Sequence, residues 1–509
     1  MVMSEGQVLS TAFGRVLGDR VGGVLRYRGV PFAGRLDGAA RWMPPSWPEP
    51  WDGVRPALVN AAPVPQNPPS YDEKGVAYHA YLNGPRDTVP VSEEGLFLNL
   101  WTPSLDPQAR RPIMIYIHGG GFELGSPSSP RTQGDRLAAA GDVVVISAAH
   151  RLNVPGYLYL DEISGGKHRT ANLGLLDLVH LLHWVADHAS AFGGDADNVT
   201  LFGESGGGMK ISALTMMPAA RGLFRRGICQ AGVMAPPART GARFGFLTPA
   251  QATERSLRLI QGLGVDPTPQ ALGALDWREL LARNAELARP FDEGPAYWRP
   301  VLDDRTLSVA AYHDPAQALP VDLLLGTTTH EGDFFMNTYK SFASSERLRE
   351  EPGRQGPAIV ARYLERFGNP EDADAQLIGD WVFRMPTLAC ADQRALAGRK
   401  TWLYQFDWRR QQPPFRPTHG SEGPFIFGTG DVCGFCEGAE EVPVVTALVQ
   451  SVWLSFARQG VPADALNGAW APHVAGSNLA YTLRCQATPE TGLLAPVRQT
   501  WLADAALPA

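Results

Sequence analysis

Short, continuous runs of apolar residues recur along this chain, and each run is followed by a turn or loop. Five runs are rich in β-branched or aromatic residues: Pro112–Ile117, Asp142–Ser147, Asn198–Phe202, Val321–Leu325 and Thr401–Phe406. Unbroken apolar runs of this length are typical of strands that are buried on both faces of a parallel sheet. The pattern therefore predicts a large, mostly parallel central sheet.

A helical pattern separates these strands. Apolar residues recur at helical spacing through Leu173–Ala191, which ends at Gly193, and again through Val444–Arg458, which ends at Gly460. Strands that alternate with helices indicate an α/β fold, with a twisted sheet flanked by helices on both sides. The residues up to about Tyr27 predict a small N-terminal β-meander, and the stretch around 236–320 predicts an inserted helical cap.

Composition excludes several classes of protein. The chain has 509 residues, of which 44% are hydrophobic and 19% charged, so it can bury a large core and is not disordered. A net charge of -7 provides no basic field for nucleic acid or an anionic membrane. No apolar stretch approaches the roughly 18 residues that span a bilayer, and the N-terminus lacks a signal-peptide pattern. We expect a cytoplasmic protein with no nucleic-acid or membrane partner.

The five cysteines are few and odd in number, which fits a reducing compartment better than a disulfide framework. Cys433 and Cys436 form a single C-x-x-C motif. A zinc site would need a second pair, so a plain surface loop is the favoured interpretation and no metal or cofactor is expected.

The run Gly203-Glu204-Ser205-Gly206-Gly207 contains the best candidate nucleophile. A G-x-S-x-G elbow places serine on a sharp strand-to-helix turn, where flanking glycines keep side chains out of the bend. Here the Asn198–Phe202 strand precedes Ser205, and the stretch Gly207–Met217 is expected to be the following helix. A chance glycine-rich turn is the alternative.

A second glycine-rich run, His118-Gly119-Gly120-Gly121-Phe122, follows the Pro112–Ile117 strand. Acyl transfer places negative charge on the carbonyl oxygen, and fixed backbone N–H groups stabilise it. The run matches the HGGG type of oxyanion loop, so Gly120, Gly121 and Gly206 are the expected donors. A purely structural glycine turn is the alternative.

One of eleven histidines has to serve as the base. Most lie on the crossover helix, in the oxyanion loop or away from any strand end. His419 lies on the loop after the Thr401–Phe406 strand, and in this fold class the order along the chain is serine, acid, histidine. The acid then falls between Ser205 and His419. Glu331, after the Val321–Leu325 strand, fits by position, with three rivals: Asp303, Asp304 and Asp333.

These motifs resemble the type-B carboxylesterase and cholinesterase family of the α/β-hydrolase superfamily, including its bacterial members. The similarity spans nearly the whole chain and is carried by these segments: Tyr27 to Ala33, Arg41-Trp42 with Pro44-Pro45, Ser92 to Trp101, Phe192 to Asp195, Asn198 to Gly207, Glu331-Gly332 and His419-Gly420. The resemblance assigns the family's acid to Glu331. It also implies two structural ion pairs, Arg41 with Glu93 and Arg151 with Asp177, and supporting carboxylates at Glu204 and Glu422.

Departures from the family pattern are informative. Val64 and Gly95 stand where extracellular members carry a disulfide, which agrees with an intracellular protein. Ala231 replaces a serine of the family's Gln-Ser-Gly run. The stretch 81–91 lacks the tryptophan with which cholinesterases bind a quaternary ammonium, so choline specificity is disfavoured.

The residues together predict a serine carboxylesterase that works through a Ser-His-Glu triad and an acyl-enzyme, on a small-molecule ester. Because Gly120 and His419 contribute to one site, residues 1–509 are expected to form a single catalytic domain. An amidase or carbamate hydrolase with the same triad is the nearest alternative, and a non-catalytic binding module the remote one. Phe122, Phe334 and Phe335 are candidate pocket residues. The preferred acyl and alcohol groups and the oligomeric state are left open.

Overall fold

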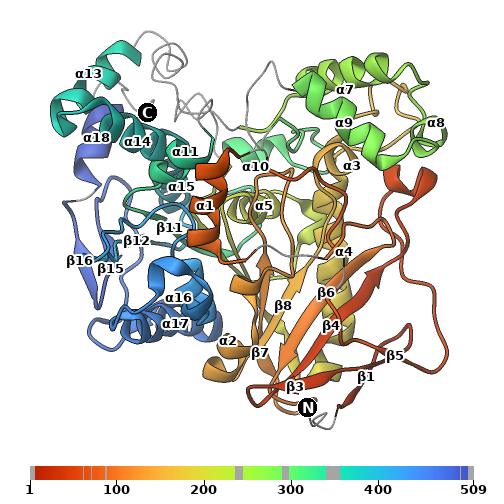
Figure 1. The fold of residues 1–509 in the computed structure, drawn as a ribbon, viewed down its shortest axis with the longest axis horizontal. Helices are drawn as coiled ribbons and strands as arrows, with labels where there is room; N and C mark the ends of the chain where they lie inside the picture. The colour runs from red at the N-terminus through yellow and green to blue at the C-terminus, as the bar shows by residue number, and fades with distance from the viewer. Residues whose placement is uncertain are drawn as a thin grey trace.

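An eleven-stranded mixed sheet forms the centre of the computed structural model, which describes residues 6–60, 62–69, 71–85, 89–234, 245–288, 297–339, 356–492 and 494–502 (Figure 1). In spatial order the strands are β16 (Ala487–Glu490), β15 (Ala480–Leu483), β12 (Thr401–Phe406), β11 (Asp322–Thr328), β10 (Arg226–Gln230), β9 (Gly194–Glu204), β7 (Arg111–Ile117), β8 (Val144–Ala148), β6 (Leu96–Thr102), β4 (Val24–Ala33) and β3 (Asp19–Val21). Every neighbouring pair from β15 to β8 is parallel, and the outer pairs are antiparallel. The α/β architecture expected from the sequence is confirmed.

Both faces of this sheet are buried, which explains why its strands are apolar without a break. Along β7, Ile113, Ile115 and Ile117 belong to one hydrophobic cluster, whereas Met114 and Tyr116 belong to the other. Successive side chains of a strand point to opposite faces, so a strand between two helical layers has no polar side.

Helices cover both faces of the sheet (Figure 1). The described helices are α1 (Glu73–Asn83), α2 (Asp135–Gly141), α3 (Asn153–Tyr157), α4 (Leu173–His188), α5 (Gly206–Leu214), α7 (Pro249–Leu263), α8 (Pro269–Gly273), α9 (Trp277–Ala288), α10 (Val309–His313), α11 (Gly332–Thr338), α13 (Gly356–Phe367), α14 (Pro370–Gly379), α15 (Met385–Leu396), α16 (Gly423–Phe427), α17 (Val442–Gln459) and α18 (Ala495–Leu502). Helices α4, α5 and α15 pack on one face, and α2, α16 and α17 on the other.

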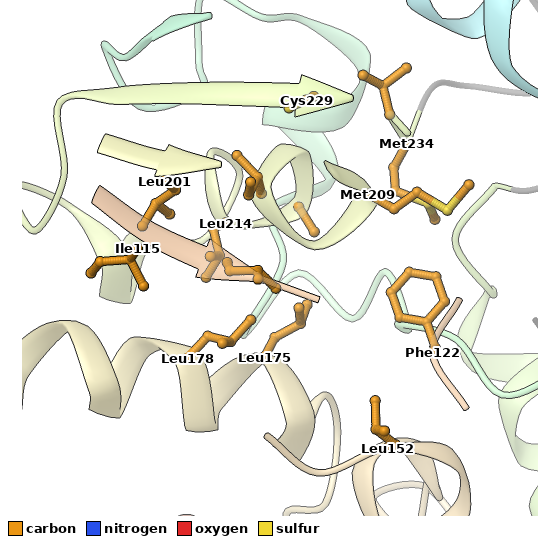
Figure 2. Close-up of a cluster of buried hydrophobic side chains, with 14 of the residues drawn as sticks. Ile115, Phe122, Leu152, Leu175, Leu178, Leu201, Met209, Leu214, Cys229 and Met234 are labelled. Carbon is orange, nitrogen blue, oxygen red and sulfur yellow. The ribbon is translucent and has the colours of Figure 1, made fainter. Parts of the chain in front are cut away.

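The core beside the candidate nucleophile lies between α4, α5 and the strands β7 and β9. Figure 2 shows Leu175 and Leu178 of α4 below Ile115 and Leu201 of the sheet. These side chains are almost entirely inaccessible to solvent. The turn that connects β9 to α5 is therefore built on a rigid, well-packed base.

The N-terminal meander differs from the expectation. Strands β1 (Val8–Ser10) and β2 (Arg15–Leu17) pair with β5 (Val54–Pro56) in a separate three-stranded sheet. Strands β3 and β4, by contrast, extend the central sheet. The ten-residue β4 buries residues on both of its faces, so it continues the main core beyond Tyr27.

The stretch expected as a helical cap contains helices α7 to α10, and the first three lie at one end of the molecule (Figure 1). Helix α7 starts with a capping box in which the side chains of Thr248 and Gln251 each bind the other residue's backbone N–H. Residues 235–244 and 289–296 of this stretch lie outside the described residues, and its identity as an inserted cap stays a prediction.

None of the described helices combines the length and the apolar character needed to span a membrane.

Candidate active site

Ser205 occupies a sharp turn between β9, which ends at Glu204, and α5, which begins at Gly206. Its backbone angles, φ 55° and ψ -123°, are strained for a residue with a side chain. A Cβ at Gly203 would lie 2.4 Å from the carbonyl oxygen of Ile117, and one at Gly207 would lie 2.0 Å from the same atom. The glycines are therefore required because the turn presses directly against the end of β7.

The glycine-rich loop after β7 lies beside this turn. Gly120 and Gly121 both have positive φ, 86° and 61°, and both line the same cleft as Ser205. The backbone N–H of Leu124 donates to the carbonyl of Gly120 at 3.0 Å and closes the loop. A Cβ on Gly206 would lie 2.0 Å from the carbonyl oxygen of Gly121, so all three expected oxyanion donors belong to one contiguous patch of backbone.

Glu331 and His419 are in direct contact, although 88 residues separate them in the chain. Nδ1 of His419 donates to Oε2 of Glu331 at 2.6 Å, and the backbone N–H of Thr328 donates to Oε1 at 2.5 Å. The Glu331 side chain is fully buried. Their loops meet because β11 and β12 are adjacent and parallel, and because the backbone N–H of His330 donates to the carbonyl of Pro417. The rival Asp333 is instead paired with Arg416.

A second carboxylate approaches the other nitrogen of this imidazole. Oε1 of Glu204 lies 3.0 Å from Nε2 of His419, but the angle is unsuitable and Nε2 makes no hydrogen bond with any described residue. Burial disfavours the imidazolium, yet the negative charge of Glu204 and the charge and hydrogen bond of Glu331 outweigh it and raise the pKa of His419. Two carboxylates therefore favour the cationic form of His419.

Glu422 lies three residues after His419, at the start of α16, and is fully buried. Its Oε1 accepts a hydrogen bond from the hydroxyl of Tyr404 at 3.4 Å, while its Oε2 has no partner among the described residues. Burial, reinforced by the charges of Glu331 and Glu204, raises the pKa of Glu422 to about 8. This carboxyl group is therefore protonated at neutral pH.

The cleft in front of Ser205 has a volume of about 290 Å³. Phe334 and Phe335 line it, together with Ser205 and His419, as expected from the sequence. Phe122 does not line it: its ring is fully buried and packs edge-on against Tyr157. The expectation for Phe122 is therefore wrong, because its side chain leaves the loop towards the core, where Figure 2 shows it opposite Met209.

The structure contains both ion pairs that the family resemblance implies. Arg41 pairs with Glu93 at 2.5 Å, and Arg151 pairs with Asp177 at 2.6 Å. Both pairs are largely shielded from solvent. Nowhere in the described ranges do three or more His, Cys, Asp or Glu residues gather in a way that could hold a metal ion.

Two buried cations near the site were not identified from the sequence. Arg131 lines the cleft and donates to the carbonyl of Gly420, which holds the histidine loop. Lys210 is fully buried in α5. A lysine within the otherwise apolar run that follows the elbow was an available signal, whereas nothing in the sequence around Arg131 indicated its position.

The fold and this constellation define a serine hydrolase with the α/β-hydrolase fold. Residues 5–500 match the sequence profile described as "Carboxylesterase family", and the chain belongs to that family. It is a serine carboxylesterase by this membership and by its relatives.

Similar proteins include the para-nitrobenzyl esterase of Bacillus subtilis (strain 168), 33% identical over 91% of this chain and 92% of that protein. The phenmedipham hydrolase of Pseudarthrobacter oxydans is 32% identical over 86% of this chain and 87% of that protein. A solved structure titled as a thermophilic pNB esterase superposes with a TM-score of 0.81 at 30% identity, covering 97% of this chain and 99% of that one.

Proposed function

We propose that Ser205 is the nucleophile of this carboxylesterase, His419 its general base and Glu331 the acid that orients the histidine. The 2.6 Å contact between Nδ1 of His419 and Oε2 of Glu331, in the cleft that Ser205 lines, carries this assignment. A carboxylate on Nδ1 fixes the tautomer that leaves Nε2 free to accept the serine proton. Nε2 has no hydrogen-bond partner among the described groups, as this role requires.

Acylation begins when His419 removes the proton of Ser205 and the serine oxygen attacks the ester carbonyl. The N–H groups of Gly120, Gly121 and Gly206 then stabilise the oxyanion, each contributing about 3 to 4 kcal/mol. The imidazolium gives its proton to the departing alcohol. Water repeats the sequence on the acyl-enzyme, releases the acid and restores Ser205.

The two carboxylates at His419 act on the charge that this mechanism creates. Glu331 and Glu204 both stabilise the imidazolium that forms when His419 takes the proton of Ser205. Interactions that strengthen as the transition state forms lower the barrier, whereas equal stabilisation of both states does not. The cost is that the resting histidine is also more easily protonated, so we expect activity to increase with pH.

We further propose an uncharged small-molecule ester as the substrate, because aromatic side chains such as Phe334 and Phe335 form a wall of the cleft. We also propose a single catalytic domain, because Ser205, Glu331 and His419 all lie on loops that follow strands of the same central sheet. A cytoplasmic location is proposed from the cysteines, all five of which are free.

The test is a panel of nitrophenyl esters of increasing acyl length, with matched anilides, assayed on wild type and on Ser205→Ala. We expect rapid ester hydrolysis, slow anilide hydrolysis and a loss of about 10⁴-fold or more in kcat for the variant. Faster turnover of the anilides would identify an amidase instead. Activity retained in Ser205→Ala would exclude Ser205 as the nucleophile.

A further inference from the structure

Lys210 places a cation directly behind the oxyanion loop. It lies on α5, five residues after Ser205, and its side chain is fully buried. Its Nζ donates to the carbonyl oxygen of Gly121 at 2.7 Å and lies 5.3 Å from the centre of the Phe122 ring. A lysine head group is normally solvated, so a buried ammonium that binds this particular carbonyl requires an explanation.

The surroundings of Lys210 do little to compensate for its burial. Among the described residues, titratable groups that interact electrostatically with it are Glu204 at the end of β9, His118 after β7 and His150 after β8. The two histidine rings stack at 4.3 Å, and burial together with the charge of Lys210 lowers the pKa of both, so they are neutral. Among the described residues no carboxylate forms an ion pair with Nζ within 4.0 Å.

Burial accordingly lowers the pKa of Lys210 to about 7, against the opposing effect of Glu204. An apolar side chain of the same length would avoid the desolvation cost, which is several kcal/mol for a buried ion. The amine is thus held where its charge is costly in the resting enzyme. A negative charge that develops nearby would offset that cost.

The oxyanion loop needs such a contact at this position. Gly120 and Gly121 adopt positive φ and have no side chains that could anchor the loop. Backbone donors hold the carbonyls on either side: Leu124 binds that of Gly120 at 3.0 Å, and Asn153 binds that of Phe122 at 2.7 Å. The carbonyl of Gly121, which lies between these two, accepts its hydrogen bond from the side chain of Lys210.

The same carbonyl also borders the nucleophile turn. A Cβ on Gly206 would lie 2.0 Å from this oxygen, so the Gly121 peptide fits between Gly206 and the Lys210 amine. Rotation of the peptide between Gly121 and Phe122 would displace the Cα of Gly121, and with it the preceding peptide that carries the Gly121 N–H, relative to the N–H of Gly206. Lys210 therefore couples the two segments that form the oxyanion hole.

We propose that Lys210 is a positioning residue of the oxyanion hole: it fixes the Gly121 peptide through its carbonyl and supplies a positive charge behind the developing oxyanion. This inference rests on the proposed roles of Gly120, Gly121 and Gly206. Because it acts on charge that exists only in the transition state, its loss should lower kcat and leave KM nearly unchanged.

The decisive experiment compares Lys210→Met, which preserves length and apolar bulk, with wild type on one nitrophenyl ester. We expect kcat to fall about 10- to 100-fold, at or below the lower end of the roughly 10²- to 10³-fold range seen when an oxyanion donor is lost. The affinity for a trifluoromethyl ketone, which forms an oxyanion on the serine, should fall in parallel with kcat. An unchanged kcat and inhibitor affinity in a folded Lys210→Met enzyme would overturn the proposal.

Ser212→Ala is the matched control, because Ser212 is buried on the same helix but binds Met209 and Met234 rather than the oxyanion loop. It should lower the melting temperature without changing kcat. An equal loss of kcat in both variants would mean that any damage to α5 reduces catalysis, and the specific role of Lys210 would be excluded.

A second variant covers the case in which methionine disturbs folding. In Lys210→Ala the space left by the side chain should admit ethylammonium, and we expect this ion to restore kcat in a saturable manner. Ethanol, which is similar in size but carries no charge, should not restore it. Equal effects of both additives, or of neither, would overturn the proposal.

Labelling with a fluorophosphonate separates this inference from the proposed function. Wild type and Lys210→Met should both be labelled at Ser205. Labelling at a different serine would overturn the proposed function and this inference together. Labelling at Ser205 with unchanged kinetics in Lys210→Met would overturn only the role of Lys210.

Discussion

The two walls of the active site are built on different principles. The wall that contains Ser205 and the oxyanion loop consists mainly of backbone, with glycines at the positions where a Cβ would collide with a neighbouring carbonyl. The opposite wall is built from the buried ionisable side chains of Glu331, His419 and Glu422, which come from two loops. The first wall is specified by shape and the second by charge.

This difference predicts how each wall fails. A backbone wall does not tolerate one additional carbon atom, because its contacts are already at van der Waals distance. A charged wall tolerates an isosteric change in shape but not the loss of a charge, because buried ions depend on their partners. Substitutions that change only one of these properties can therefore test the comparison.

The largest effect should come from removing a charge without changing the shape. Glu331→Gln preserves the volume of the side chain but removes the carboxylate that stabilises the imidazolium, so kcat should fall about 10³- to 10⁴-fold. Steady-state kinetics with a nitrophenyl ester measures this effect. Asp333→Asn is the control, because Asp333 pairs with Arg416 and not with His419. A comparable loss in that variant would contradict the assignment of the acid.

An intermediate effect should come from adding one carbon to the backbone wall. In Gly120→Ala the new Cβ would lie 2.4 Å from the carbonyl oxygen of Leu124, at a φ of 86°. The loop must shift and one donor is lost, so kcat should fall about 10²-fold with little change in KM.

Gly222→Ala is the control for that variant, because Gly222 has a φ of 80° and no atom within 4 Å of the added carbon. It should cost only about 1 to 2 kcal/mol of stability. A fall in kcat for Gly222→Ala, or none for Gly120→Ala, would show that strain in general, and not the oxyanion loop, controls the rate.

The smallest effect on activity is expected at Glu422, where the charge is already absent at neutral pH. The ordinary pKa of a glutamate is 4.5, and in the folded protein that of Glu422 is about 8. Between these values the folded state retains a proton that the unfolded state has lost, so wild type loses stability as pH increases. Glu422→Gln removes this dependence. Its melting temperature should match that of wild type near pH 5 and exceed it near pH 8.

Glu437→Gln is the control, because Glu437 is exposed. The difference in melting temperature between this variant and wild type should not change with pH. A Glu422→Gln variant that becomes less stable than wild type as the pH rises would show that the carboxylate is needed in its ionised form.

Much of the fold follows from local pattern. The apolar runs at 112–117 and 401–406 correspond to β7 and β12, and the crossover pattern after residue 173 corresponds to α4. These elements could be predicted because a buried strand or helix shows a recognisable pattern of apolar residues within a short stretch of sequence. Strand β10 was not predicted. Its five residues, Arg226–Gln230, include a glycine and two polar ends, and they form a strand only because β9 and β11 pair with both of their edges.

The sequence by itself determined the features that depend on a few consecutive residues. The glycines around Ser205 and in the loop after β7 indicated where the backbone bends sharply, because only glycine relieves the steric conflict at such points. The order of Ser205, Glu331 and His419 along the chain also followed from the sequence.

Only the tertiary structure decided what depends on distant segments. It brought His419 within 2.6 Å of Glu331 and turned Phe122 away from the cleft into the core. It also placed the Lys210 amine on the carbonyl of Gly121. Direction and burial of a side chain, and the energy of a charge in its surroundings, are set by atoms that the local sequence does not contain.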